Sequence, residues 1–143
     1  MNSEKLEDIL NLLARFAEAD PEILAMALCG SWARGTARDD SDIDLSIIVK
    51  DKIRFKDIKW LKTIGFEKIN DKLEHYIDKT YGRVWSRHVF LKSGTEIEFS
   101  FADESWADCE NPDTGTVKVV SDGYRIMYDP FNILQRLIHK IGM

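Results

Sequence analysis

Residues 27–49 have the sequence ALCGSWARGTARDDSDIDLSIIV, in which a polar segment separates two apolar runs. The second run alternates, so residues 43–49 are predicted to form a strand with one apolar face. Asp42 and Asp44 lie together on the other face, next to Ser46. The two acids therefore lie at the start of a buried strand, on the face that points away from the core. Their position requires a chemical explanation.

Two carboxylates at positions i and i+2 of a strand stand side by side, about 6.6 Å apart along the chain. Left bare, Asp42 and Asp44 would repel each other, and a hard divalent cation relieves that repulsion because carboxylate oxygen is its preferred ligand. Two such ions about 3.5–4 Å apart can clamp the attacking and leaving oxygens of a phosphoryl transfer. The pair therefore predicts a metal site for phosphate chemistry.

A third carboxylate is expected from the segment TEIEFSF, residues 95–101, which is also predicted to be a strand. Its apolar residues occupy one face, whereas Glu96 and Glu98 occupy the other. If both strands pack their apolar faces on one core, these acids point to the same side as Asp42 and Asp44. Glu98 is preferred because it lies deeper in the strand, and Glu96 is expected to be solvated.

The Gly30-Ser31 pair ends the first apolar run and is predicted to contact phosphate. Glycine lets a backbone approach a ligand closely, and the following SWARGTA can begin a helix whose N–H groups favour an anion. Arg34 and Arg38 either counter a polyphosphate charge or are surface arginines. Ser41 is assigned to nucleotide binding, although a serine before Asp42 is also an ordinary turn residue.

The remaining segments predict one α+β domain, residues 1–143, with a mixed, mainly antiparallel sheet and flanking helices. Helices are expected over residues 3–19, 55–65 and 130–142, strands over 24–29 and 43–49, a hairpin over 84–91 and 96–102 with a KSG turn, and two short strands within 116–129 around Asp122-Gly123. Residues 67–82 are charged and weakly periodic, and no element is assigned to them. The last helix should bury Phe131 and Leu134 and should be capped by Asp129.

Composition narrows the classes of function. The net charge is −5 and no basic stripe exists, which argues against a protein that grips long nucleic acid. No apolar segment approaches the about 20 residues needed to cross a bilayer, and the N-terminus is too acidic for a signal peptide, so the cytoplasm is the expected location. Cys29 and Cys109 are expected to be reduced thiols. The three histidines have no zinc-ligand spacing, which argues against a histidine metal site.

The pattern Gly-Ser, ARG and SDIDL, followed by EIEFSF, resembles the signature of the DNA-polymerase-β-like nucleotidyltransferase superfamily, particularly its small single-domain (minimal) members. The resemblance implies transfer of a nucleoside monophosphate from an NTP, ATP above all, to a hydroxyl group. It implies that Gly30 and Ser31 contact the triphosphate and that Asp42 and Asp44 bind Mg²⁺. Glu98 would be a metal ligand or the general base. Two Mg²⁺ ions are expected, with Mn²⁺ able to substitute.

Aminoglycoside nucleotidyltransferases usually add a helical acceptor domain after the catalytic one, whereas a single C-terminal helix is expected here. The acceptor site is therefore expected to come from few residues, from a second subunit or from a helical partner protein. Trp60, Trp85 and Trp106 are candidate walls for a ring, although a core position is the commoner use of tryptophan. Three functions stay open: modification of an aminoglycoside-like or lincosamide-like small molecule, an antitoxin that binds or adenylylates a helical toxin, and a degenerate domain that only binds nucleotide.

Overall fold

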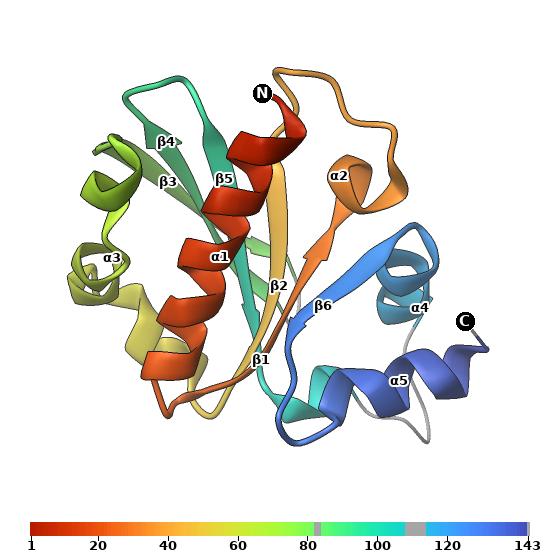
Figure 1. Cartoon of the computed structure of the whole chain (residues 1–143). Coiled ribbons are helices and arrows are strands. Elements are labelled where there is room, and N and C mark those ends of the chain that lie inside the picture. The colour runs from red at the N-terminus through yellow and green to blue at the C-terminus, as the bar shows by residue number, and fades with distance from the viewer. Residues whose placement is uncertain (82–83, 108–113, 143) are drawn as a thin grey trace.

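A six-stranded sheet organises the computed structural model, which describes residues 1–81, 84–107 and 114–142 (Figure 1). The strand order is β3-β4-β5-β2-β1-β6, and all neighbours are antiparallel except the parallel pair β2 and β5. The strands are β1 (Ile23–Cys29), β2 (Ile43–Val49), β3 (Leu73–Tyr81), β4 (Val84–Leu91), β5 (Glu96–Ala102) and β6 (Tyr124–Tyr128). The predicted α+β class, with a mixed and mainly antiparallel sheet, is confirmed.

Helices lie on both sides of this sheet. They are α1 (Ser3–Ala19), α2 (Gly30–Arg34), α3 (Lys59–Thr63), α4 (Thr114–Ser121) and α5 (Ile133–Ile141), with 3₁₀ turns η1 (Lys52–Lys56), η2 (Phe66–Ile69) and η3 (Glu104–Ala107). Figure 1 shows α1 running across one face of the sheet, whereas α4 and α5 gather near β6. Among the described residues, none of these helices has the length and apolar character that crossing a bilayer requires.

The larger core lies between α1 and the sheet. The predicted helix 3–19 is confirmed, and its apolar stripe joins the apolar residues of β1, β2 and β5 in one core. The side chain of Asn2 caps the helix by accepting a hydrogen bond from the N–H of Lys5 at 2.8 Å. Trp60 and Trp85 are buried in this core, where both contact the ring of Phe101.

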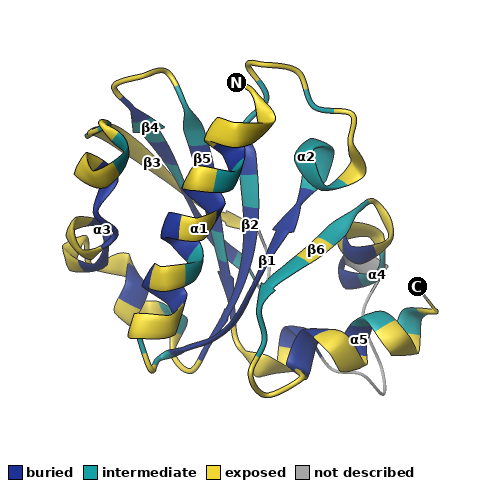
Figure 2. Cartoon of the chain, viewed as in Figure 1, coloured by how far each residue is buried: buried dark blue, intermediate teal, exposed yellow. Residues whose placement is uncertain are grey.

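A smaller core covers only part of the opposite face. Ala27, Ile48 and Ala102 pack there against residues of η3, α4 and α5, including Trp106 and Leu134. The strand residues that lie toward α2 on this face are polar and only partly covered (Figure 2). The uncovered end of the face is therefore the place where the sheet can meet a ligand.

Two predictions near the surface need correction or completion. The hairpin of β4 and β5 is as predicted, but the expected helix 55–65 is divided into η1 and α3, with Asp57 in an extended conformation between them. The unassigned segment contains η2 and β3. Because β3 is an edge strand whose described side chains are mostly exposed (Figure 2), its sequence lacks a clear apolar face.

The C-terminal third departs furthest from the predictions. Two short strands were expected in residues 116–129. The prediction of the first is wrong, because Thr114–Ser121 forms α4. The last helix begins at Ile133, and Phe131 is 58% exposed rather than buried. The Asp129 carboxylate nevertheless caps this helix, since it accepts hydrogen bonds from the N–H groups of Leu134 and Gln135 at 3.2 and 2.8 Å. Cys109 lies outside the described residues.

Candidate functional site

The parallel pairing of β2 with β5 brings the predicted acids together. Asp44 lies directly opposite Glu98, and the flanking pair Leu45 and Phe99 points into the α1 core. Asp42 directly precedes β2. Glu98, which was preferred to Glu96 because it lies deeper in the strand, is therefore the acid that lies opposite Asp44.

The acidity of Asp44 is strongly perturbed. Burial, together with the negative charges of Asp42 and Glu98, raises its pKa to about 7 against the opposing effect of Arg34. A carboxyl group with this pKa is protonated in about half of the molecules at neutral pH unless a cation balances its charge. The donor set, carboxylate oxygens converging on one face, fits a hard divalent metal ion.

Gly30 stands directly against this acid. It has a φ of +72°, and a Cβ atom added at this position would overlap Oδ2 of Asp44. Only glycine meets both requirements without strain, because other residues rarely adopt a positive φ. The Gly30-Ser31 turn therefore closes on the carboxylate and begins the short helix α2, with Ser31 partly buried at its start.

The other two residues predicted to bind nucleotide have different surroundings. Arg34 lies at the end of α2, lines the pocket described below and donates to the backbone oxygen of Asp122 at 3.3 Å. The Ser41 hydroxyl accepts a hydrogen bond from the N–H of Arg38 at 2.8 Å, and its backbone oxygen accepts one from Trp32 Nε1 at 3.1 Å. These contacts favour the turn interpretation of Ser41, which shapes the loop leading to Asp42.

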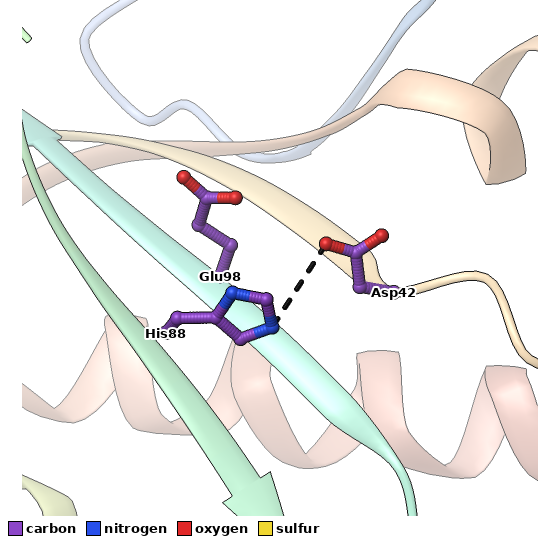
Figure 3. Close-up of side chains that lie close together, drawn as sticks. All are labelled: Asp42, His88 and Glu98. Atoms are coloured by element: carbon purple, nitrogen blue, oxygen red, sulfur yellow. Dashed lines mark ion pairs between the residues drawn. The ribbon is translucent and has the colours of Figure 1, made fainter. Parts of the chain in front are cut away.

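His88 is the residue that the sequence reasoning missed. It lies opposite Glu98 in the β4–β5 register, and one ligand atom each from Asp42, His88 and Glu98 lie within 4.8 Å of one another (Figure 3). The missed signal was the KSG turn: a three-residue connection pairs Leu91 with Thr95 and thereby places His88 against Glu98. The spacing of histidines along the chain could not reveal this.

A pocket of about 360 Å³ extends from these acids along the sheet. Its floor includes a row of hydroxyls, because Ser46, Ser100 and Ser86 are register partners on three adjacent strands. The Ser86 and Ser100 hydroxyls lie 2.8 Å apart. Trp106 also lines the pocket, so it is the one of the three candidate tryptophans that borders it, while Trp60 and Trp85 lie in the opposite core.

Cys29 also lines the pocket but offers no reactive thiolate. Burial raises the pKa of its thiol to about 12, and the charges of Asp44 and Glu98 act in the same direction. Since the thiolate is the nucleophilic form, Cys29 stays an inert, protonated side chain at neutral pH. The chemistry of the pocket therefore belongs to its carboxylates, hydroxyls and imidazole.

Comparison with solved structures gives matches at low sequence identity. An aminoglycoside 6-adenyltransferase from Bacillus subtilis matches with a TM-score of 0.55 and 19% identity, over 75% of this chain and 37% of that enzyme. A toxin-antitoxin structure with AMP-PNP matches at a TM-score of 0.44 and 13% identity, over 99% of this chain and 84% of that one. A CCA-adding enzyme in its apo form I matches at 0.45 and 15%, over 96% and 32%.

At the level of sequence, no curated protein matches the chain. Residues 11–80 match the family model described as Polymerase beta, Nucleotidyltransferase. The matched segment includes Gly30, Ser31, Asp42 and Asp44, while the sheet register adds Glu98 from beyond it. Residues 11–80, just under half of the chain, are thus similar to polymerase-β-like nucleotidyltransferases, and the aminoglycoside 6-adenyltransferase shares the fold.

Proposed function

We propose that this chain transfers a nucleoside monophosphate from a nucleoside triphosphate, ATP in the first place, to a hydroxyl group of an acceptor, with release of pyrophosphate. The observation that carries the proposal is the convergence of Asp42, Asp44 and Glu98 on one sheet face beside the Gly30 turn. The family match over residues 11–80 supports the same reaction class.

Each of these residues then has a role. Asp42 and Asp44 hold a divalent metal ion. The ion would supply positive charge to the triphosphate and to the attacking and leaving oxygens of the phosphoryl transfer. Because the pKa of Asp44 is raised to about 7, metal binding near neutral pH releases its proton. Glu98 either completes the ligand set or accepts the proton of the attacking hydroxyl. Gly30 and Ser31 position the triphosphate, and Arg34 adds positive charge nearby.

The pocket next to the acids is the proposed place for a ring of the nucleotide or of the acceptor. Ser46, Ser86 and Ser100 offer hydroxyls to this pocket, and Trp106 adds an aromatic surface to its lining. Hydroxyls that are already oriented by the sheet can donate to or accept from ring substituents, and the indole buries the apolar part of a ring. This arrangement favours a compact ligand with both polar and apolar edges.

For the acceptor we favour a cationic small molecule of the aminoglycoside-like or lincosamide-like kind. The chain has a net charge of −5, and Asp44, Glu98 and Asp122 all line the pocket, which suits a positively charged acceptor. The similar fold of an aminoglycoside 6-adenyltransferase makes that class the natural first panel to test.

An antitoxin-type role is the second candidate. The observation that favours it is the exposed edge strand β3, where Ile77 is 48% exposed and Tyr76 is 37% exposed. An unpaired edge with apolar side chains is suited to a protein partner. In that case a helical partner would be bound or would itself receive the nucleoside monophosphate.

The test is label transfer from [α-³²P]ATP in the presence of Mg²⁺ or Mn²⁺. Acceptors are an aminoglycoside panel, a lincosamide panel and any helical protein that co-purifies with the full chain. Label should appear on one acceptor, and Asp44→Asn should abolish it, whereas Asp40→Asn, in the exposed loop, should not. Absence of transfer together with absence of metal-dependent nucleotide binding would refute the proposal.

A further inference from the structure

We infer that His88 is a metal ligand in this site and that its nitrogen gives the site a preference for Mn²⁺ over Mg²⁺. The inference rests on the proposed function in so far as both use the acids Asp42 and Glu98. It goes further because it adds an imidazole to an all-carboxylate ligand set and names the kind of ion that the set selects.

The sheet places His88 in line with the acids. Its register partner on β5 is Glu98, whose partner on β2 is Asp44, so three adjacent strands present a continuous row. Nε2 of His88 lies 4.0 Å from Oδ2 of Asp42. Figure 3 shows the imidazole beside the Glu98 and Asp42 side chains, on the same face of the sheet. An ion bound by both acids would therefore meet the ring.

Stacking holds the imidazole in this orientation. The ring centroids of Phe90 and His88 lie 4.6 Å apart at an interplanar angle of 7°. The ring of His75 also stacks on Phe90, at 4.3 Å and 7°. The ring of His88 is thus fixed before any ligand arrives. A ligand that is already oriented loses little conformational entropy when it coordinates, which favours binding.

The coordinating nitrogen is available in the described part of the chain. Nε2 of His88 is buried and makes no hydrogen bond of acceptable geometry there. Its nearest acidic contact is Oε1 of Glu96 at 3.2 Å, an ion pair that exists only when the ring is protonated. A buried polar atom without a hydrogen bond is costly, and a metal ion would satisfy it.

An imidazole changes which ion the site prefers. Mg²⁺ is a hard ion that takes oxygen ligands in nearly ideal octahedral geometry, so a fixed nitrogen in its shell is unfavourable. First-row transition ions accept imidazole readily, and Mn²⁺ also accepts carboxylates. Two carboxylates with one imidazole therefore favour Mn²⁺, whereas the carboxylates alone would discriminate little between the two ions.

The experiment uses the full chain and Mn²⁺ itself as the probe. Free Mn²⁺ is titrated by its EPR signal with Mg²⁺ as competitor, and bound Mn²⁺ is examined by pulsed EPR for coupling to ¹⁴N. We expect Mn²⁺ to bind at least about tenfold more tightly than Mg²⁺, with clear ¹⁴N coupling. His88→Phe keeps the stack on Phe90 but should lose the coupling and weaken Mn²⁺ binding about tenfold or more, with little change for Mg²⁺.

Two control variants separate this role from others. His75→Phe makes the same substitution at the outer member of the stack and should keep both the coupling and the affinity. Glu96→Gln removes the ion-pair partner and should also keep the coupling. Thermal unfolding of each variant identifies any that fails to fold; in that case ¹⁴N coupling in the unsubstituted protein decides alone.

The outcomes distinguish the two proposals. Mn²⁺ binding that depends on Asp44 but shows no ¹⁴N coupling, or that is unchanged in His88→Phe, would overturn the role of His88 and leave the proposed function standing. Absence of any metal binding by the unsubstituted protein, at micromolar to millimolar metal concentrations, would overturn both the role of His88 and the proposed function. Coupling that persists in His75→Phe and disappears in His88→Phe would support the inference.

Discussion

Replacing Asp44 with Asn should make the metal-free protein more stable at pH 8. The raised pKa of Asp44 means that its charged form is less favourable in the folded than in the unfolded chain. The stability contributed by the protonated group is fully present below about pH 4 and is lost as pH rises through about 7. A shift from 3.8 to about 7 corresponds to at most about 4 kcal/mol. Because Asp44 is only half-buried, solvent screening reduces the expected effect to about 1–2 kcal/mol.

The assay is urea unfolding at pH 5 and pH 8 in the presence of EDTA. Because this window covers about two thirds of the shift from 3.8 to about 7, the free energy of unfolding of the unsubstituted protein should fall by about 1 kcal/mol more than that of Asp44→Asn. Adding Mn²⁺ at pH 8 should restore the loss in the former and not in the latter. The matched control Asp40→Asn should follow the unsubstituted protein. Parallel pH profiles for Asp44→Asn and the unsubstituted protein would refute the electrostatic account of this site.

Three further substitutions test other parts of the structure. Gly30→Ala should cost about 1–3 kcal/mol in urea unfolding and weaken metal-dependent ATP binding, because it strains a positive φ and crowds Asp44; unchanged binding would contradict this. Arg87→Met should cost about 3 kcal/mol or more, since it strips the ion pair from Asp78 and empties a fully buried guanidinium site; a loss below about 1 kcal/mol would be inconsistent. Trp106→Leu should raise the Kd or KM of the ligand that occupies the pocket about fivefold, measured by titration or initial rates; an unchanged value would remove the indole from the ligand's surroundings.

The acid row was predictable because it depends on strand alternation. The buried strands β2 and β5 each carry a clear apolar face. The sequence alone therefore shows that Asp44 and Glu98 each lie on the face of their strand that points away from the α1 core. Their direct pairing follows from a parallel register that no local pattern encodes. The position of His88 could have been derived from the KSG turn. The turn fixes the hairpin register, and the register pairs His88 with Glu98.

The segments whose secondary structure was predicted wrongly or left unassigned have no clear apolar face in the sequence. The β-branched run TVKVV has high strand propensity, yet it lies in α4, where Val120 packs into the smaller core. Strand β3 is exposed at the sheet edge, so its charged sequence carries little periodicity. In both cases tertiary contacts with distant residues outweigh the local preference, which a single sequence does not display.

Binding of a non-hydrolysable ATP analogue tests the central claim most directly. Isothermal titration should be run in Mg²⁺, in Mn²⁺ and in EDTA, with the unsubstituted protein, Asp44→Asn and Glu98→Gln. The account predicts binding that requires the metal ion and weakens at least about tenfold in both variants, because the carboxylates hold the ion that meets the triphosphate. Equal affinity in EDTA and in metal, or equal affinity in all three proteins, would contradict it.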